Sequence, residues 1–327
     1  MHPAFSVIFL TTLIGAGQGL FLALFSAQAY TELNLLPSMS DTNFFGVGSV
    51  LAFAFLAAGL VSSVFHLGHP ERAWRAASMW RTSWLSREVI ALPAMMAMIF
   101  IYGIMHLFGM DGVIYSSATG NNFSYSLIVA GSLAMIASFV LFICTGMIYA
   151  CIKFLQEWAT PLTVINYALF GVASGFTFAA AFGSFYDAPE MTKFFGIWAI
   201  ILTVVVMITR LASMYRNSRI KHKSSMKSAI GVRHNKIQQK AMGMQGGSYN
   251  TREYFHGKTA MFLKSVKYIF LVLVFPIPVV LLAAGLGTAD STLLVAAFVV
   301  QYVGLIFERW YFFAQSNHPQ NLYYQTV

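Results

Sequence analysis

The sequence predicts an all-α integral membrane protein with eight transmembrane helices. Of its 327 residues, 58% are hydrophobic and only 9% are charged, and the mean hydropathy is +0.68. A soluble domain uses roughly 25% charged residues to solvate its surface, so most of this surface faces lipid instead. The apolar segments are long enough to span, since about 20 helical residues cross a hydrocarbon core of ~30 Å. Inside lipid each segment has to satisfy its own backbone hydrogen bonds, which makes it a helix.

Eight apolar segments follow one another along the chain, and most carry no ionisable residue in their middle third. The first and fifth segments are rich in small residues, among them Gly15, Gly19, Gly171 and Gly175, which favour close helix packing in lipid. Together the segments predict one membrane domain, 1–327, with spans at 5–30, 43–66, 88–109, 124–150, 161–184, 193–215, 265–286 and 291–313.

One long polar stretch, 216–264, separates the sixth span from the seventh. It is rich in Lys, Arg, His, Ser, Gln and Gly and has little apolar periodicity. We therefore expect an extended basic loop that lies on a membrane surface or on a partner protein.

The distribution of charge predicts the orientation of the chain. Eight spans place both termini on one side, here named side A, and we name the opposite side B. Side A holds nineteen Lys and Arg residues and five acidic residues, a net charge of +14; side B holds Lys193 and six acidic residues, a net charge of −5. Because cytoplasmic loops carry the excess of Lys and Arg, side A is predicted to be cytoplasmic. We expect a multi-pass protein of the bacterial inner (cytoplasmic) membrane, and the basic loop explains the positive charge without nucleic acid.

The densest group of polar residues follows the second span and runs from His66 to Glu88. Its Trp and Arg residues are typical of membrane interfaces, where they anchor at lipid headgroups. His66 and Glu88 differ from them because they lie at the ends of spans, where a titratable group is costly unless it is paired or used.

A second polar group lies at the same predicted depth near the ends of the sixth and eighth spans. The two groups contain either mutually paired structural ions or a pocket for a polar head, and we prefer the pocket. A quinone fits such a pocket, because a His or Arg holds a carbonyl oxygen while a carboxylate or imidazole exchanges the proton. The residues concerned are His66, Arg87, Glu88, Arg210, Glu308 and Arg309.

The remaining histidines and the cysteines argue against a metal site and against a transmembrane proton relay. A haem with two histidine ligands needs them at matched depth, but His66 and His106 are predicted at opposite ends of their spans, so no haem is expected. Cys144 and Cys151 are too few for an iron–sulfur cluster. Only His106 stands near side B, whereas a proton pump or ion-coupled transporter needs a relay of such groups.

Three short motifs resemble the dimethyl sulfoxide reductase membrane-anchor family. They are His66-Leu67-Gly68-x-Pro70-x-Arg72-Ala73-Trp74, Ser86-x-Glu88 and Glu308-Arg309-x-x-Phe312. The resemblance implies a subunit without haem that exchanges electrons with a membrane quinone and docks an iron–sulfur subunit. That partner connects to a molybdopterin catalytic subunit, so the anchor has no catalytic residues for substrate chemistry. The resemblance implies quinone binding by His66, Arg87, Glu88, Glu308 and Arg309, and we expect partner docking at His69, Arg72, Arg75 and Arg81.

The predicted orientation narrows the resemblance to a subgroup. In respiratory dimethyl sulfoxide reductases the face with the histidine motif lies outside the cytoplasm, whereas here it is predicted inside. The chain is therefore more similar to anchors of cytoplasm-facing enzymes, and quinone-linked sulfite dehydrogenase fits best, with ubiquinone or menaquinone as electron acceptor. Alternatives are the anchor of a quinol-oxidising reductase, a secondary transporter, for which the prolines of the seventh span are the only hint, and a membrane scaffold protein.

Overall fold

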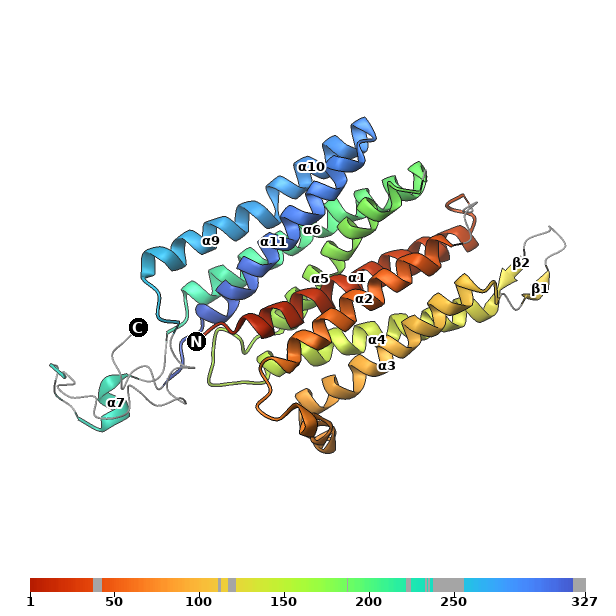
Figure 1. The fold of residues 1–327 in the computed structure, drawn as a ribbon. Helices are drawn as coiled ribbons and strands as arrows, with labels where there is room; N and C mark the ends of the chain where they lie inside the picture. Colours follow the sequence, from red (N-terminus) through yellow and green to blue (C-terminus); the bar gives the residue numbers. More distant parts are fainter. Residues whose placement is uncertain are drawn as a thin grey trace.

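The computed structural model describes residues 1–37, 43–110, 113–116, 122–186, 188–221, 225–232, 234, 236–237 and 256–319. Eight of its helical segments are long and apolar enough to cross a membrane, which confirms the prediction of eight helical spans (Figure 1). Their bounds are α1 Phe5–Glu32, α2 Phe44–Val64, α3 Trp84–Leu107, α4 Tyr125–Ala150, α5 Pro161–Gly183, α6 Pro189–Ser218, α9 Ala260–Val274 with α10 Pro276–Thr288, and α11 Ser291–Ala314.

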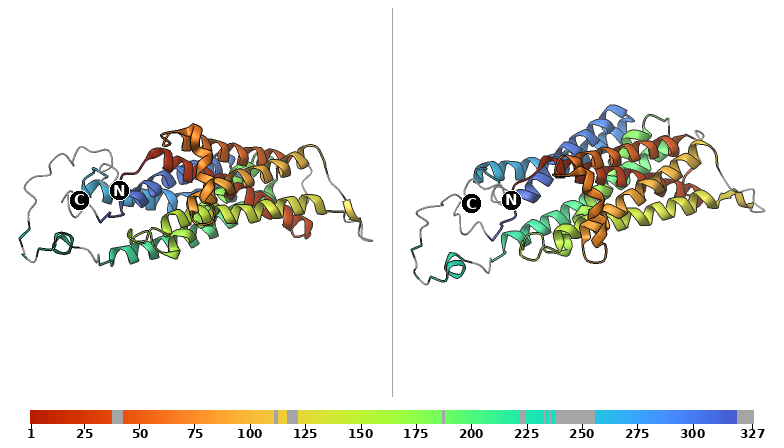
Figure 2. Two further views of the ribbon diagram at one scale, coloured as in Figure 1. Left: turned by 90° about the horizontal axis from the view of Figure 1, so that it is seen from below. Right: turned by 60° about the horizontal axis from the view of Figure 1, so that its bottom comes forward.

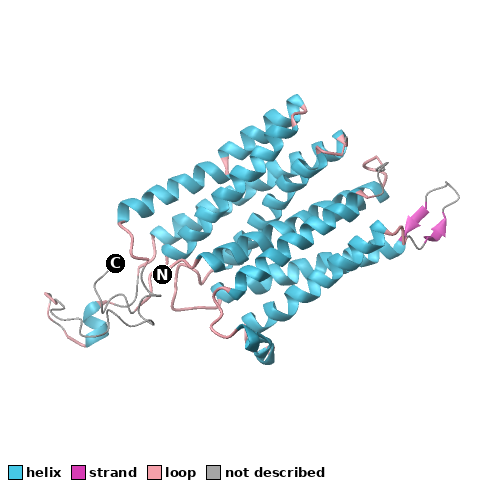
Figure 3. Ribbon diagram, in the orientation of Figure 1, coloured by secondary structure: helices cyan, strands magenta, loops and turns pink. Residues whose placement is uncertain are grey.

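One connection departs from the all-α prediction. The strands β1 (Val113–Ser116) and β2 (Asn122–Ser124) pair as an antiparallel hairpin between α3 and α4, at one tip of the bundle (Figure 3). The sequence Val113-Ile114-Tyr115 consists of residues with high strand propensity. A hairpin therefore forms here at the bundle tip, between two spans.

The connections on side A also contain helix. The 3₁₀ helix η1 (Pro70–Met79) follows α2, α6 continues to Ser218, and the short helix α7 (Met226–Ile230) lies within the predicted loop. Much of the loop 216–264 lies outside the described residues. In both views of Figure 2, α7 and the β hairpin lie at opposite ends of the molecule. One membrane face thus carries the short helix and the other carries the hairpin.

The centre of the bundle is the contact between α1 and α5. These are the two most enclosed spans, and α1 also packs against α2, α4 and α11. A Cβ atom on Gly19 would overlap the carbonyl group of Gly171, and one on Gly175 would overlap the backbone of Gly19. The backbones approach so closely because these positions are glycine, as the small-residue pattern indicates.

The seventh span is broken in its middle rather than continuous. Pro278 has no N–H, so the carbonyl of Val274 loses its helical partner. Gln301 of α11 compensates, because its Nε2 lies 3.5 Å from that carbonyl and 3.1 Å from the Thr203 hydroxyl. A neutral buried amide thus closes the break between α9 and α10.

Candidate functional site

Glu88 lies in the second turn of α3 and faces the interior of the bundle. Ser83 caps the helix and accepts a hydrogen bond from the backbone N–H of Ser86, so α3 begins just before the carboxylate. The Glu88 carboxylate accepts a hydrogen bond from the hydroxyl of Thr145 on α4. An ionisable group inside a membrane span is costly, so Glu88 is a candidate functional residue.

Two small cavities lie inside the bundle, one beside Glu88 and one beside Arg309. The first has a volume of about 10 Å³ and is lined by Glu88 and Thr145 together with Thr11, Gly15 and Tyr167. The second cavity also has a volume of about 10 Å³. It too is lined by Thr11, Gly15 and Tyr167, and in addition by Arg309. Each volume matches about one water molecule in a polar setting. The two cavities are neighbours, because Thr11, Gly15 and Tyr167 line both of them.

Arg210, Glu308 and Arg309 form a buried ion triad. Arg210 Nη2 lies 2.9 Å from Glu308 Oε1, and Arg309 Nη1 lies 3.3 Å from Glu308 Oε2. Only 1% of the Glu308 side chain is exposed. The guanidinium carbon of Arg309 stands 3.7 Å from the centre of the Tyr167 ring, a cation–π geometry. The sequence placed these ions in one layer with His66, whereas the structure pairs them with one another inside the bundle.

His66 lies just beyond the side A end of α2 and is exposed. Partial burial lowers the pKa of its imidazole below the ordinary value of 6.5. In the described part of the chain, no hydrogen bond or ion pair joins His66 to Glu88. His106 lies near the side B end of α3, so these two histidines are at opposite ends of the bundle and cannot share a haem.

Arg87 fastens the segment before α3 to the helix. Its Nε donates to the Trp80 carbonyl at 2.9 Å, its Nη2 donates to the Arg81 carbonyl at 2.8 Å, and its guanidinium stacks on Trp84. Two of its donors are thus used within the chain.

The segment from His69 to Arg81 forms an exposed surface, named here the η1 surface. Its helix has no buried residue, and Trp74 is 72% exposed. The basic residues predicted to dock a partner are all here. His69 and Arg72 pair with Glu71 at 3.0 and 3.6 Å, and Arg75 and Arg81 lie over the rings of Trp74 and Trp80.

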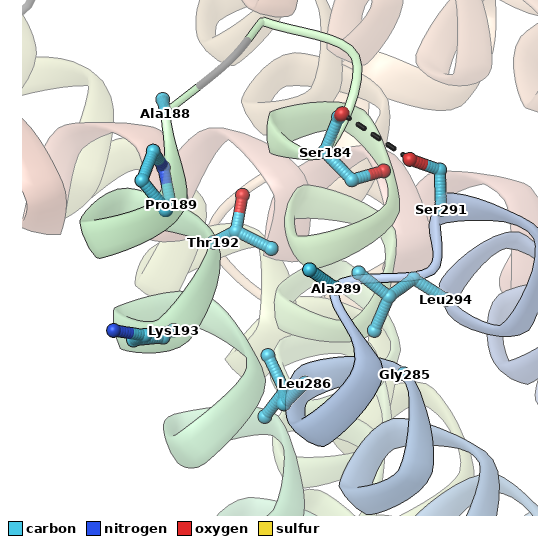
Figure 4. A pocket seen from close by; sticks show the side chains of 10 residues that line it. All are labelled: Ser184, Ala188, Pro189, Thr192, Lys193, Gly285, Leu286, Ala289, Ser291 and Leu294. Atoms are coloured by element: carbon cyan, nitrogen blue, oxygen red, sulfur yellow. Dashed lines mark hydrogen bonds between the residues drawn. The ribbon is translucent and has the colours of Figure 1, made fainter.

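A larger cavity lies elsewhere, at the side B ends of α5, α6, α10 and α11, and has a volume of about 330 Å³ (Figure 4). The Ser291 hydroxyl donates to the Ser184 carbonyl at its edge, 3.3 Å away. Leu286 and Leu294 supply much of its apolar wall. It contains none of the predicted site residues, so size alone does not identify the site.

Sequence reasoning missed the neutral polar residues around Glu88. Thr145 and Tyr167 contact the site, and Gln18 donates to the Ser138 carbonyl at 3.0 Å beside it. The available signal was a hydroxyl or an amide inside an apolar span. Such residues occur in most membrane helices, so their approach to Glu88 follows only from the helix packing.

The fold and the site together define a multi-pass membrane protein with an ionisable centre close to one face and an exposed basic segment on that face. The family model described as DMSO reductase anchor subunit (DmsC) matches residues 1–324, so the chain belongs to that family, as its motifs indicate. It is 54% identical to a subunit of the sulfite dehydrogenase of Allochromatium vinosum over 327 residues, which cover all of both chains. The protein is thus an anchor subunit of an oxidoreductase-type complex.

Proposed function

We propose that this chain is the quinone-reactive anchor of a complex that oxidises sulfite to sulfate. It passes electrons between an iron–sulfur partner subunit and the quinone pool of the bacterial inner membrane. The observation that carries the proposal is the Glu88 carboxyl, held by Thr145 inside the bundle close to side A. The family and the name of the Allochromatium relative support the kind of complex.

Quinone reduction needs two electrons and two protons, and two titratable groups of this chain lie on the side where they are required. The Glu88 carboxyl gives a proton to one quinone oxygen. His66, at the exposed end of α2, binds the other oxygen and exchanges its proton with water. Arg87 holds the segment between η1 and α3 in place. Glu308 and Arg309 contribute to the quinone site from inside the bundle.

The η1 surface is the proposed docking site of the iron–sulfur subunit. Basic side chains next to exposed tryptophans suit an acidic partner surface, since Arg and Trp are enriched at interface centres. In the proposed orientation this surface faces the cytoplasm. The molybdopterin catalytic subunit then lies beyond the iron–sulfur subunit, and sulfite never meets this chain.

Glu88→Gln in the intact complex tests the proposal. We expect sulfite-dependent quinone reduction to fall about 100-fold or more, as for loss of a general acid, while sulfite oxidation with a soluble artificial acceptor stays normal. The control is Glu190→Gln, an exposed acid on side B that pairs with Lys193 at 3.0 Å. Unchanged quinone reduction in Glu88→Gln would rule out this site.

A further inference from the structure

The buried ion triad carries more positive charge than negative. It contains the guanidinium groups of Arg210 and Arg309 but only the carboxylate of Glu308, and all three side chains are at most 5% exposed. A buried charge without a counter-charge is strongly unfavourable. The triad therefore has a net positive charge that an anion nearby would stabilise.

Among the described residues, Glu88 is the acid that lines the cavity next to that of Arg309. Glu88 lines the first cavity, Arg309 lines the second, and Tyr167 lines both of them. The neutral groups around Glu88 are Thr11 and Gln18 of α1 and Thr145 of α4. The titratable or charged groups near it are Arg87 on its own helix, Cys144 and Tyr149 on α4, and Tyr167 on α5.

Arg87 does not fill the role of counter-charge. Its guanidinium donates to the carbonyls of Trp80 and Arg81 and stacks on Trp84, at the side A surface. Arg309 stands instead against the face of Tyr167, at the far end of the cavities. The two cavities beside Tyr167 thus lie between Glu88 and the net positive charge of the triad.

We propose that each cavity holds one water molecule and that these waters, together with the Tyr167 hydroxyl, connect Glu88 to Arg309. Arg309 and Tyr167 are then positioning residues that stabilise the Glu88 carboxylate. This inference rests on the proposed function. When Glu88 gives its proton to the quinone, the electrons come from the iron–sulfur subunit, and water on side A returns a proton to the carboxylate after quinol leaves.

Gly15 provides a substitution that blocks this connection with little disturbance of the helices. It lines both cavities, and a Cβ atom there would lie 3.5 Å from the Cα of Gly171, an ordinary van der Waals contact. Gly15→Ala therefore fits between α1 and α5 but occupies space that the waters need. Tyr167→Phe removes the hydroxyl and keeps the ring under Arg309.

The test is a pH titration of the Glu88 carboxyl in the intact complex by infrared difference spectroscopy, with the band assigned by its loss in Glu88→Gln. Losing the connection to Arg309 destabilises the carboxylate. We expect Gly15→Ala and Tyr167→Phe each to raise the titration midpoint by about one pH unit, a tenfold change in the protonation equilibrium. The matched control is Gly287→Ala on α10, whose added Cβ meets no atom within 4 Å.

Unchanged midpoints in both variants would overturn the inference, even where Glu88→Gln has lost quinone reduction. The converse outcome is a midpoint that is raised in Gly15→Ala and Tyr167→Phe while Glu88→Gln reduces quinone normally. That result would refute the proposed function but would support the connection between Glu88 and Arg309. The two variants act by different means, so a folding failure of either one leaves the other to decide. An equal shift in Gly287→Ala would contradict the local connection.

Discussion

Arg210 of α6 and Glu308 of α11 form a buried ion pair, with 2.9 Å between Nη2 and Oε1. Glu308 also contacts its chain neighbour Arg309 at 3.3 Å, so one carboxylate serves two guanidinium groups. The pair joins two helices that are nearly a hundred residues apart in the sequence. The contribution of this pair to stability depends on the presence of two guanidinium groups and only one carboxylate.

Glu308→Gln is expected to destabilise the protein more than Arg210→Gln. The first change leaves two buried guanidinium groups without a carboxylate between them, at a cost of roughly 3–5 kcal/mol. The second leaves Glu308 paired with Arg309. Thermal unfolding of the detergent-solubilised complex measures the difference, and the reverse order of the two unfolding temperatures would contradict the pairing.

Gly19→Ala is expected to separate α1 from α5. Its methyl group would overlap the Gly171 carbonyl, which is backbone and cannot rotate away. Overpacking of this kind costs roughly 1–3 kcal/mol. The yield and unfolding temperature of the purified complex report the effect. Gly287→Ala is the control and should be neutral or slightly stabilising, because alanine favours helix by up to ~1 kcal/mol.

Arg75→Glu combined with Arg81→Glu is expected to release the iron–sulfur subunit. Both side chains lie over exposed tryptophans of the η1 surface, and reversing their charge repels an acidic partner. We expect co-purification of the partner to fall about tenfold and to become more sensitive to salt. Lys193→Glu reverses a charge on side B, and a similar loss there would argue against docking at the η1 surface.

A reporter fused after Val327 tests the orientation. If side A is cytoplasmic, green fluorescent protein should fluoresce there, and alkaline phosphatase should be inactive at the same point. The opposite pattern is expected for reporters inserted after Ser116, in the hairpin on side B. Periplasmic phosphatase activity after Val327 would place the η1 surface outside the cytoplasm and change the class of partner enzyme.

Much of the fold was predictable because hydropathy is a property of contiguous residues. Each span can be predicted from the hydropathy of its own segment. The concentration of basic residues on side A and the short motifs can be recognised in the same local way. The hairpin of β1 and β2 was not predicted, because a short strand pair depends on two segments meeting. The break at Pro278 was visible as a proline, but its closure by Gln301 required the position of α11.

The motifs indicated His66 and Glu88, but the residues that surround these two side chains could not be predicted from the sequence. Thr145 comes from another helix, and Glu308 with Arg309 turns inward to Arg210 rather than toward His66. Which face of a helix points inward depends on its rotation about its axis. In a span that is apolar on all sides, the sequence pattern leaves that rotation open.

The sequence by itself determined the eight helices, the concentration of positive charge on side A and the family to which the chain belongs. Length, hydropathy and short motifs carry that information locally. Only the tertiary structure decided that the ions of α6 and α11 form a closed triad and that two neighbouring small cavities lie beside Glu88 and Arg309. The physical reason is that these contacts join six helices, and their relative rotation and depth are set by packing between helices rather than by any one segment.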